Sequence, residues 1–201
     1  LPLGVEGPVR VTTAGGSFTL AGPSFGQPPF VEFQGLSGVA QAGTPTDPSA
    51  VSVLNGQTLT LIGRGFTTST LVQFEGVDEA GLAGTITRGG SVTDNGTRLQ
   101  VTVPAQARTG LVRVVGSPAR FALQVVPRVR SVGGAFVPGQ NVTLEGSGLL
   151  AGDLVVTIDG QPATVVGGQT NTELGLSQQV VDVLVPAGAT AGVVEVQTAG
   201  G

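Results

Sequence analysis

Carboxylates, hydroxyls and arginines are the side chains with which this chain could do chemistry. Its 201 residues contain 13 acidic and nine basic side chains, all nine of them arginine, and no His, Cys, Met, Trp or Tyr. Nucleophilic triads normally use His or Lys as the base, and zinc sites use His or Cys. A glycosidase needs only two facing carboxyl groups, about 5 to 9.5 Å apart, so it is the mechanism left to consider.

Seven acidic residues are the candidates for such a pair. They are Glu75, Asp78, Glu79 and Asp94 in the first half of the chain, and Asp153, Asp159 and Glu173 in the second. Neither Asp153 nor Asp159 belongs to a recognisable catalytic motif. We interpret all seven as solvated turn residues, which Asp commonly is, and we predict that the chain is not an enzyme.

Calcium is the cofactor that deserves consideration, because it binds hard oxygen ligands. The acidic cluster Glu75, Asp78 and Glu79 supplies the calcium candidates. The sequence contains neither the D-x-D-x-D-G loop of an EF-hand nor a G-G-x-G-x-D repeat, so no motif supports these three residues. No other cofactor and no other metal ligand is expected.

The charge balance argues against a nucleic-acid partner. The net charge is −4 and the pI is about 4.6, whereas phosphate binding needs clustered positive charge. We expect a group of five arginines to line a junction between two domains: Arg108, Arg113, Arg120, Arg128 and Arg130. No run approaches the roughly 18 apolar residues that cross a bilayer, so membrane insertion is not expected.

Sequence blocks return along the chain in a fixed order. Residues 194–201 (VEVQTAGG) repeat residues 9–16 (VRVTTAGG), and residues 139–149 (GQNVTLEGSGL) repeat residues 56–66 (GQTLTLIGRGF). Three later blocks follow the same order, with 72–76, 101–104 and 110–114 returning as 156–160, 183–186 and 192–196. Such self-similarity indicates an array of similar units.

Each block also predicts its own local structure. Residues 58–62 and 141–145 alternate polar and apolar side chains, which is the pattern of a half-buried strand. The strands are separated by turn signals such as Asn55-Gly56 and Asn95-Gly96. Short strands in units of about 80 to 100 residues predict an all-β chain of tandem immunoglobulin-like β-sandwiches.

The spaced motifs resemble one family. The run G-Q-x-V-T-L-x-G-x-G-L at 139–149, V-x-I-D-G-Q-P-A at 156–163 and the pattern from 183 to 201 resemble the IPT/TIG immunoglobulin-like domains, which are of the E-set type. Such domains occur in plexins, Rel-type transcription factors and large bacterial surface proteins. The resemblance implies a fold without shared catalytic residues. Residues 78–94 depart from it as an insertion that lengthens the first unit.

The blocks divide the chain into four parts. Residues 1–20 resemble the closing strands of a preceding repeat, residues 21–29 form a Pro-rich linker, and residues 30–126 and 127–201 form two immunoglobulin-like domains. The two domains meet at Val126-Pro127 without a Gly/Ser-rich spacer, so we predict a stiff connection. The absence of Met predicts that these residues are internal to a longer or processed protein.

The opening segment is the predicted interface. Leu1, Val9, Val11, Phe18 and Leu20 belong to strands that would lack a sheet of their own. The interpretation we favour is an arbitrary cut in a continuous polymer. The alternative is a strand that completes the sheet of a neighbouring molecule through main-chain hydrogen bonds.

These features predict a structural repeat module of a long bacterial protein that is secreted or displayed on the cell surface. It would form a stalk, an extracellular filament or an adhesin, with other repeats or other copies as its partners. The alternative is a carbohydrate- or ligand-binding module accessory to another domain. The lack of Trp and Tyr disfavours a sugar platform, because such platforms usually present those rings.

Overall fold

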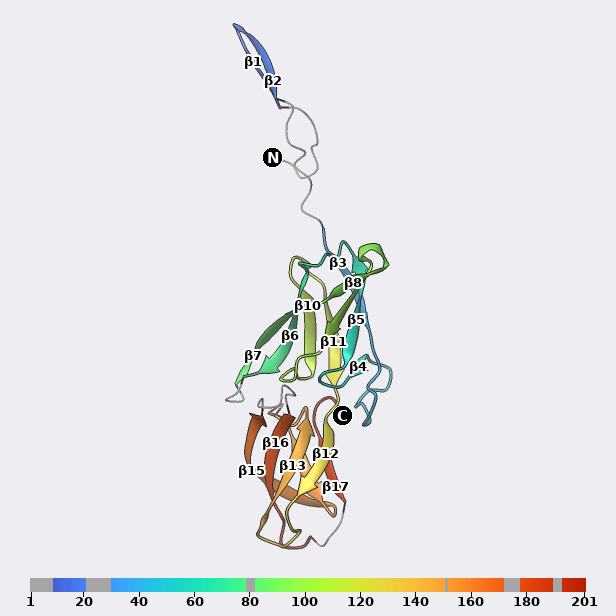
Figure 1. Ribbon diagram of the computed structural model, residues 1–201, viewed down its shortest axis with the longest axis vertical. Coiled ribbons are helices and arrows are strands. Elements are labelled where there is room, and N and C mark those ends of the chain that lie inside the picture. Colours follow the sequence, from blue (N-terminus) through green and yellow to red (C-terminus); the bar gives the residue numbers. More distant parts are fainter. Residues whose placement is uncertain (1–8, 21–29, 79–81, 151, 172–177, 190–192) are drawn as a thin grey trace.

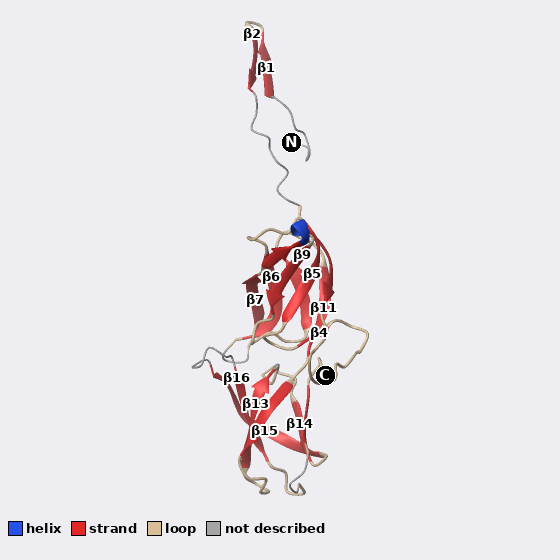
Figure 2. Ribbon diagram, turned by 45° about the vertical axis from the view of Figure 1, so that its right-hand side comes forward, coloured by secondary structure: helices blue, strands red, loops and turns tan. Residues whose placement is uncertain are grey.

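The computed structural model is built of strands and turns (Figure 1). It describes residues 9–20, 30–78, 82–150, 152–171, 178–189 and 193–201. Within these ranges there is no α-helix, and a single 3-10 turn, η1 (Asp94–Gly96), appears as the blue segment of Figure 2. The described residues also contain no helix that is long and apolar enough to cross a membrane. The all-β prediction is confirmed.

The first sandwich consists of two sheets that face each other. One sheet has the strand order β4 (Ser52–Val53), β11 (Arg120–Val125), β10 (Gly110–Val114), β6 (Leu71–Val77) and β7 (Ala83–Gly89). The other has the order β3 (Glu32–Ser37), β5 (Thr58–Arg64), β9 (Arg98–Thr102) and β8 (Ser91–Thr93). All neighbours are antiparallel except β4 and β11, which are parallel.

Alternating side chains hold these two sheets together. In β5 every second residue is buried, and Leu59 and Leu61 are fully inaccessible to solvent. They belong to the same apolar cluster as Phe74 and Leu123 of the facing sheet. Because burial of each Leu or Phe side chain stabilises the fold by about 1.5 to 3 kcal/mol, this period-two pattern fixes which face of each strand points inward.

The second sandwich is one six-stranded antiparallel sheet that encloses a core of its own. Its order is β12 (Arg128–Gly133), β13 (Asn141–Ser147), β16 (Gln178–Leu184), β15 (Gln161–Asn171), β14 (Val155–Ile158) and β17 (Val194–Gln197). Strand β15 pairs with β14 at its start and with β16 after it, and its register shifts between Val165 and Gly167. A bulge of this kind bends a strand. Leu144 and Ile158, from β13 and β14, therefore belong to one cluster.

Backbone hydrogen bonds repeat where the sequence blocks repeat. Gly56 N donates to Val103 O at 2.9 Å, and Gly139 N donates to Val185 O at 3.0 Å. In both turns the glycine has φ of +80°, a conformation that favours Gly over other residues. The same match holds later in the chain, where the donor–acceptor pairs are Ala107 N to Pro104 O and Ala189 N to Pro186 O, each 3.1 Å long.

The repeated G-x-G motif also has one structural reason in both sandwiches. A Cβ on Gly63 would overlap the carbonyl oxygen of Glu32, and a Cβ on Gly146 would overlap that of Arg128. Both glycines therefore let the first strand of their sandwich approach closely. That strand carries a bulge in each case, between Phe33 and Gly35 in β3 and between Val129 and Ser131 in β12.

A separate hairpin precedes the two sandwiches. Strand β1 (Val9–Thr13) pairs with β2 (Gly16–Leu20) in an antiparallel two-stranded sheet. Its register places Val9 opposite Leu20 and Val11 opposite Phe18. The predicted linker 21–29 lies outside the described residues.

Candidate functional site

The junction between the sandwiches is formed by the chain itself. Strand β11 ends at Val125 and β12 begins at Arg128, so two residues connect them. Both are buried, and Val126 N donates to Val53 O at 2.9 Å. In Figure 1 the two sandwiches lie end to end, and the chain passes from β11 directly into β12. The connection therefore lacks the exposed, polar backbone of a flexible linker.

One glutamine connects the two sandwiches. Gln179, at the start of β16, is 2% exposed. Its Oε1 accepts from Leu149 N at 2.5 Å and from Leu150 N at 3.0 Å, while its Nε2 donates to Ala105 O of the first sandwich at 3.0 Å. Both polar atoms of the amide thus have partners, and their geometry fixes the loop after β13 against the end of the first sandwich.

The chain's last residues contact the first sandwich on another side of the junction. Thr46 N donates to Gly200 O at 3.3 Å, and the Thr46 hydroxyl donates to Ala199 O at 3.1 Å. Ala199 N in turn donates to Asp153 Oδ2 at 2.6 Å. The loop that carries Thr46 is held by Gln124, whose amide exchanges two 2.8 Å hydrogen bonds with the backbone of Asp47. Contacts on several sides oppose bending at the junction.

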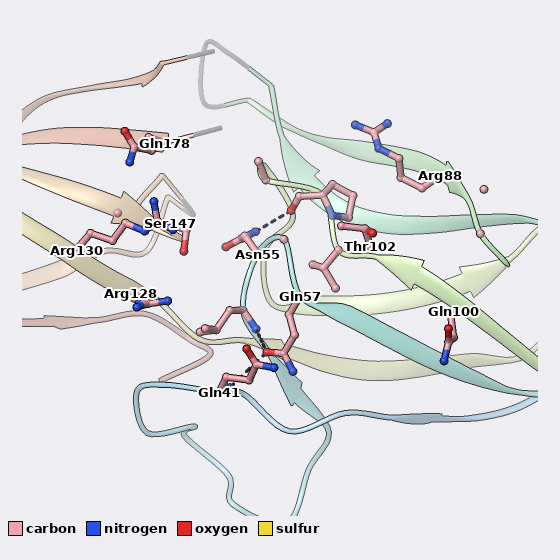
Figure 3. A pocket seen from close by; sticks show the side chains of 18 of the residues that line it. Gln41, Asn55, Gln57, Arg88, Gln100, Thr102, Arg128, Arg130, Ser147 and Gln178 are labelled. Atoms are coloured by element: carbon pink, nitrogen blue, oxygen red, sulfur yellow. Dashed lines mark hydrogen bonds between the residues drawn. The ribbon is translucent and has the colours of Figure 1, made fainter. Parts of the chain in front are cut away.

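A groove of about 730 Å³ runs from the junction along the first sandwich (Figure 3). Arg128, Arg130, Ser147 and Gln178 line it on the second sandwich. On the first sandwich it is lined by residues that include Gln41, Asn55, Gln57, Arg88, Gln100 and Thr102. Among the described residues that line it there is no Asp or Glu. The groove is therefore locally cationic in a chain whose net charge is −4.

Most polar side chains of this groove are not committed to the fold. Arg128 and Arg130 are exposed and make no ion pair with any residue that the structure describes. The Arg88 guanidinium donates only to the neighbouring Thr87 O, at 3.0 Å. Asn55 and Gln57 are exceptions. The Asn55 Nδ2 donates to Pro104 O and Ala107 O, both at 2.8 Å, and the Gln57 amide accepts from Leu54 N and donates to Val39 O. Uncommitted guanidinium groups can bind carboxylate or sulfate oxygens.

The five arginines that we expected at the junction divide into two groups. Arg128 and Arg130 line the groove there, and Arg108 lines a smaller pocket of about 200 Å³ with Thr109, Gly152 and Asp153. The expectation was wrong for Arg113 and Arg120. These two are cross-strand partners near the β10–β11 turn, and six residues of extended chain place Arg120 about 20 Å from Val126.

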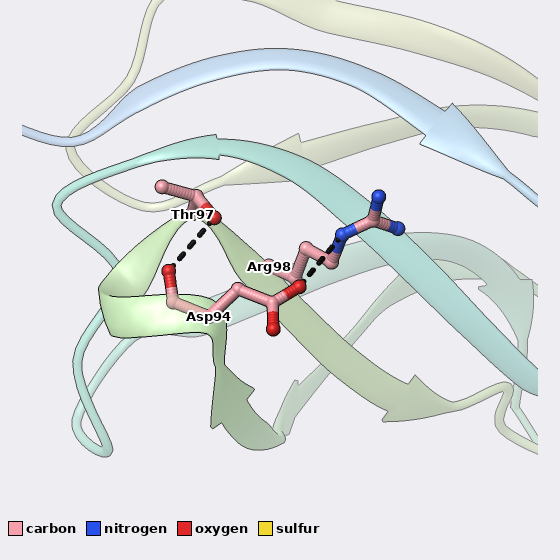
Figure 4. Close-up of polar contacts among 3 residues, drawn as sticks. All are labelled: Asp94, Thr97 and Arg98. Atoms are coloured by element: carbon pink, nitrogen blue, oxygen red, sulfur yellow. Dashed lines mark hydrogen bonds and ion pairs between the residues drawn. The ribbon is translucent and has the colours of Figure 1, made fainter.

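The acidic candidates that the structure describes outside β6 lie in separate local surroundings. Asp94 forms an exposed ion pair with Arg98 at 2.9 Å, and its carbonyl accepts from the Thr97 hydroxyl at 2.8 Å (Figure 4). Asp153 holds Ala199 N at the junction, and Asp159 occupies a turn with φ of +53° between β14 and β15. Glu173 lies outside the described residues. The carboxylates of Asp94 and Asp153 therefore have local structural roles.

The calcium candidates occupy the end of β6. Glu75 lies 3.9 Å from the Arg108 guanidinium, and its Oε1 accepts from Leu111 N at 3.3 Å. Asp78 Oδ1 accepts from Leu82 N at 2.8 Å. Glu79 lies outside the described residues, and no group of three or more possible ligands occurs within the described part. A calcium site at these residues stays a prediction.

The predicted interface falls on the N-terminal hairpin. Val9, Val11, Phe18 and Leu20 have the backbone register given above, and Leu1 lies outside the described residues. Sequence reasoning did not identify Gln179 or Gln124, which turned out to fix the junction. A buried Gln in a strand looks like any polar residue in an alternating pattern, and only its partners in other segments reveal its role.

Comparison of this chain with protein-family models, curated proteins and solved structures found no match. Function must therefore be inferred from the residues of the chain itself.

Proposed function

We propose that this chain is a structural spacer module of a long bacterial protein that is secreted or displayed on the cell surface. In this proposal residues 30–126 and 127–201 are tandem immunoglobulin-like domains of the IPT/TIG type, and residues 1–20 are the closing strands of a preceding repeat. The module acts mechanically and not as an enzyme. Its partners are neighbouring repeats or other copies, and nucleic acid is not among them.

The observation that carries the proposal is the direct junction. A two-residue buried connection, the Gln179 contact with Ala105 and the Thr46 contacts with residues 199–200 together hold one sandwich against the next. An array of units fixed in this way transmits force and maintains distance, because each unit contacts its neighbours along a line. The repeated turn hydrogen bonds support the view that both units follow one design.

Immunogold electron microscopy of the source cells tests this proposal. An antibody raised against the chain is expected to label intact, unpermeabilised cells, at regular intervals along a stalk or fibre. Labelling that appears only after permeabilisation would refute an extracellular spacer.

The groove favours a second function, the binding of an anionic saccharide by the accessory-module alternative. Its uncommitted Arg88, Arg128 and Arg130 suit carboxylate or sulfate groups, and the Gln, Ser and Thr side chains suit sugar hydroxyls. Calorimetry with a sulfated hexasaccharide tests it. The R128Q/R130Q variant should bind about tenfold more weakly, whereas R113Q/R120Q, which loses the same charge elsewhere, should bind like the parent chain. Equal effects of both variants would exclude a specific groove.

A further inference from the structure

The loop between β3 and β4 contains the single Asp–Pro bond of the chain, which joins Asp47 to Pro48. Both residues are exposed. Peptide bonds of this type break in acid more readily than other main-chain bonds. The Asp carboxylate can attack its own main-chain carbonyl carbon, and the proline nitrogen, which carries no hydrogen in the peptide, leaves readily once it is protonated. The contacts around this bond bear on both parts of that reaction.

Two N–H donors point at the carbonyl oxygen of the bond. Gln124 Nε2 donates to Asp47 O at 2.8 Å, and Ala50 N donates to the same oxygen at 3.2 Å. Gln124 is 7% exposed, and its Oε1 also accepts from Asp47 N at 2.8 Å, so its amide group is fixed in orientation. Fixed donors of this kind stabilise the negative charge that develops on a carbonyl oxygen under nucleophilic attack.

The carboxylate of Asp47 is held beside the same bond. Its Oδ1 accepts from the Ser49 hydroxyl at 2.6 Å and from Ser49 N at 2.8 Å, whereas its Oδ2 bonds to no residue that the structure describes. The Ser49 hydroxyl and then the Ser49 N–H hold the pKa of Asp47 below its ordinary value, so the carboxylate stays ionised in weak acid. The groups that contact this loop from β11 and from residues 199–200 are an amide and main-chain carbonyls, which carry no charge.

We propose that the fold promotes cleavage of its own Asp47–Pro48 bond in weak acid. Asp47 Oδ2 attacks the Asp47 main-chain carbonyl carbon and forms a cyclic anhydride. The carbon–nitrogen bond to Pro48 breaks as the nitrogen takes a proton from the acidic medium and leaves as a secondary amine. Water then hydrolyses the anhydride, and Asp47 becomes a new C-terminal residue. The event occurs once per chain, needs no His or Lys base, and goes beyond the spacer role without depending on it.

Cleavage would leave the two fragments together in the folded chain. Residues 1–47 retain β3, which pairs with β5 from Glu32 opposite Arg64 to Ser37 opposite Thr60. Phe33 of β3 is 3% exposed and belongs to the core of the first sandwich. The covalent connection through this sandwich would thus become one that sheet pairing and burial alone maintain. An acidic medium would thereby create a defined place at which the chain separates on unfolding.

Denaturing gel electrophoresis and mass spectrometry of the purified full chain test the proposal. One sample is kept at the lowest pH at which circular dichroism shows the native fold, and a second is unfolded in urea at the same pH. Fragments 1–47 and 48–201 should form at least about tenfold faster in the native sample, because unfolding releases the fixed donors and the held carboxylate. Equal rates, a slower native rate or no cleavage would overturn the proposal, since the fold would then contribute nothing.

Variants of the native chain test the assigned groups. Gln124→Met removes one donor from the Asp47 carbonyl oxygen but leaves the Asp–Pro sequence intact, and it should slow cleavage by about tenfold or more. The control Gln140→Met, an exposed change before β13, should be cleaved like the parent chain. Asp47→Glu keeps the charge but requires a larger ring, so it should remain uncut. A parent-like rate in Gln124→Met or Asp47→Glu would overturn the mechanism, and the urea comparison decides the proposal even where a variant does not fold.

Discussion

Replacement of Gln179 by Met should destabilise the protein strongly, although Met has a similar length. The change removes the hydrogen bonds to Leu149 N, Leu150 N and Ala105 O. A net hydrogen bond contributes about 0.5 to 1.5 kcal/mol, and a buried donor left without a partner costs about 1 to 3 kcal/mol. Leu149 is 1% exposed, so water cannot replace the lost acceptor there. We expect a loss of about 2 to 4 kcal/mol in the free energy of unfolding.

Urea denaturation followed by circular dichroism measures this loss, because the chain has no Trp or Tyr to serve as a fluorescent probe. The matched control is Gln178→Met, on the same strand. Gln178 is half-buried and its side chain makes no hydrogen bond to any described residue, so this change should stay within about 0.5 kcal/mol. Equal shifts for the two variants would refute the role given to Gln179.

Three further predictions concern separate parts of the molecule. Gly146→Ala should lower the free energy of unfolding by about 1 to 3 kcal/mol, because the new Cβ would overlap the Arg128 carbonyl oxygen. In the same urea assay the control Gly84→Ala should be nearly neutral, because a Cβ there meets nothing within 4 Å. Equal losses for the two variants would contradict the packing argument. Hydrogen bonds from the Ser49 hydroxyl and, second, from the Ser49 N–H lower the pKa of Asp47 below the ordinary value of 3.8. The ionised carboxylate therefore stabilises the fold above that pH, and its contribution disappears as the pH falls through the lowered pKa. An NMR titration should show a higher pKa for Asp47 in Ser49→Ala, and an unchanged value would contradict that cause. Arg98→Gln should change the free energy of unfolding by no more than about 1 kcal/mol, because the side chains of its ion pair are exposed, Asp94 by 61% and Arg98 by 51%. A larger loss in urea would contradict a surface role for this pair.

Local sequence patterns predicted the strands because alternation reports burial directly. Residues 58–62 and 141–145 lie in β5 and β13, and the Asn55-Gly56 turn has the positive φ that its glycine suggested. A short connection at Val126-Pro127 could also be predicted, since no Gly/Ser-rich spacer separates the blocks. These features depend on neighbours in sequence.

Features that depend on distant segments could not be predicted. Five arginines close in sequence were expected at one place, but an extended strand carries Arg120 away from the junction. Gln179 connects the two sandwiches because its strand begins beside Ala105, which precedes it by 74 residues. The place of β17 beside β14 in the described sheet likewise follows from strand order and not from residue type. Main-chain pairing of this kind leaves no single-residue signature.

Residual dipolar couplings measured by NMR on the full chain test the central claim most directly. Amide couplings from residues 32–125 and from 128–197 should fit one common alignment tensor, with the relative orientation of the sandwiches shown in Figure 1. Such a result would establish a stiff end-to-end junction. Two tensors that differ in magnitude would show independent tumbling of the two sandwiches, and they would contradict the proposal that this chain maintains distance as a rod.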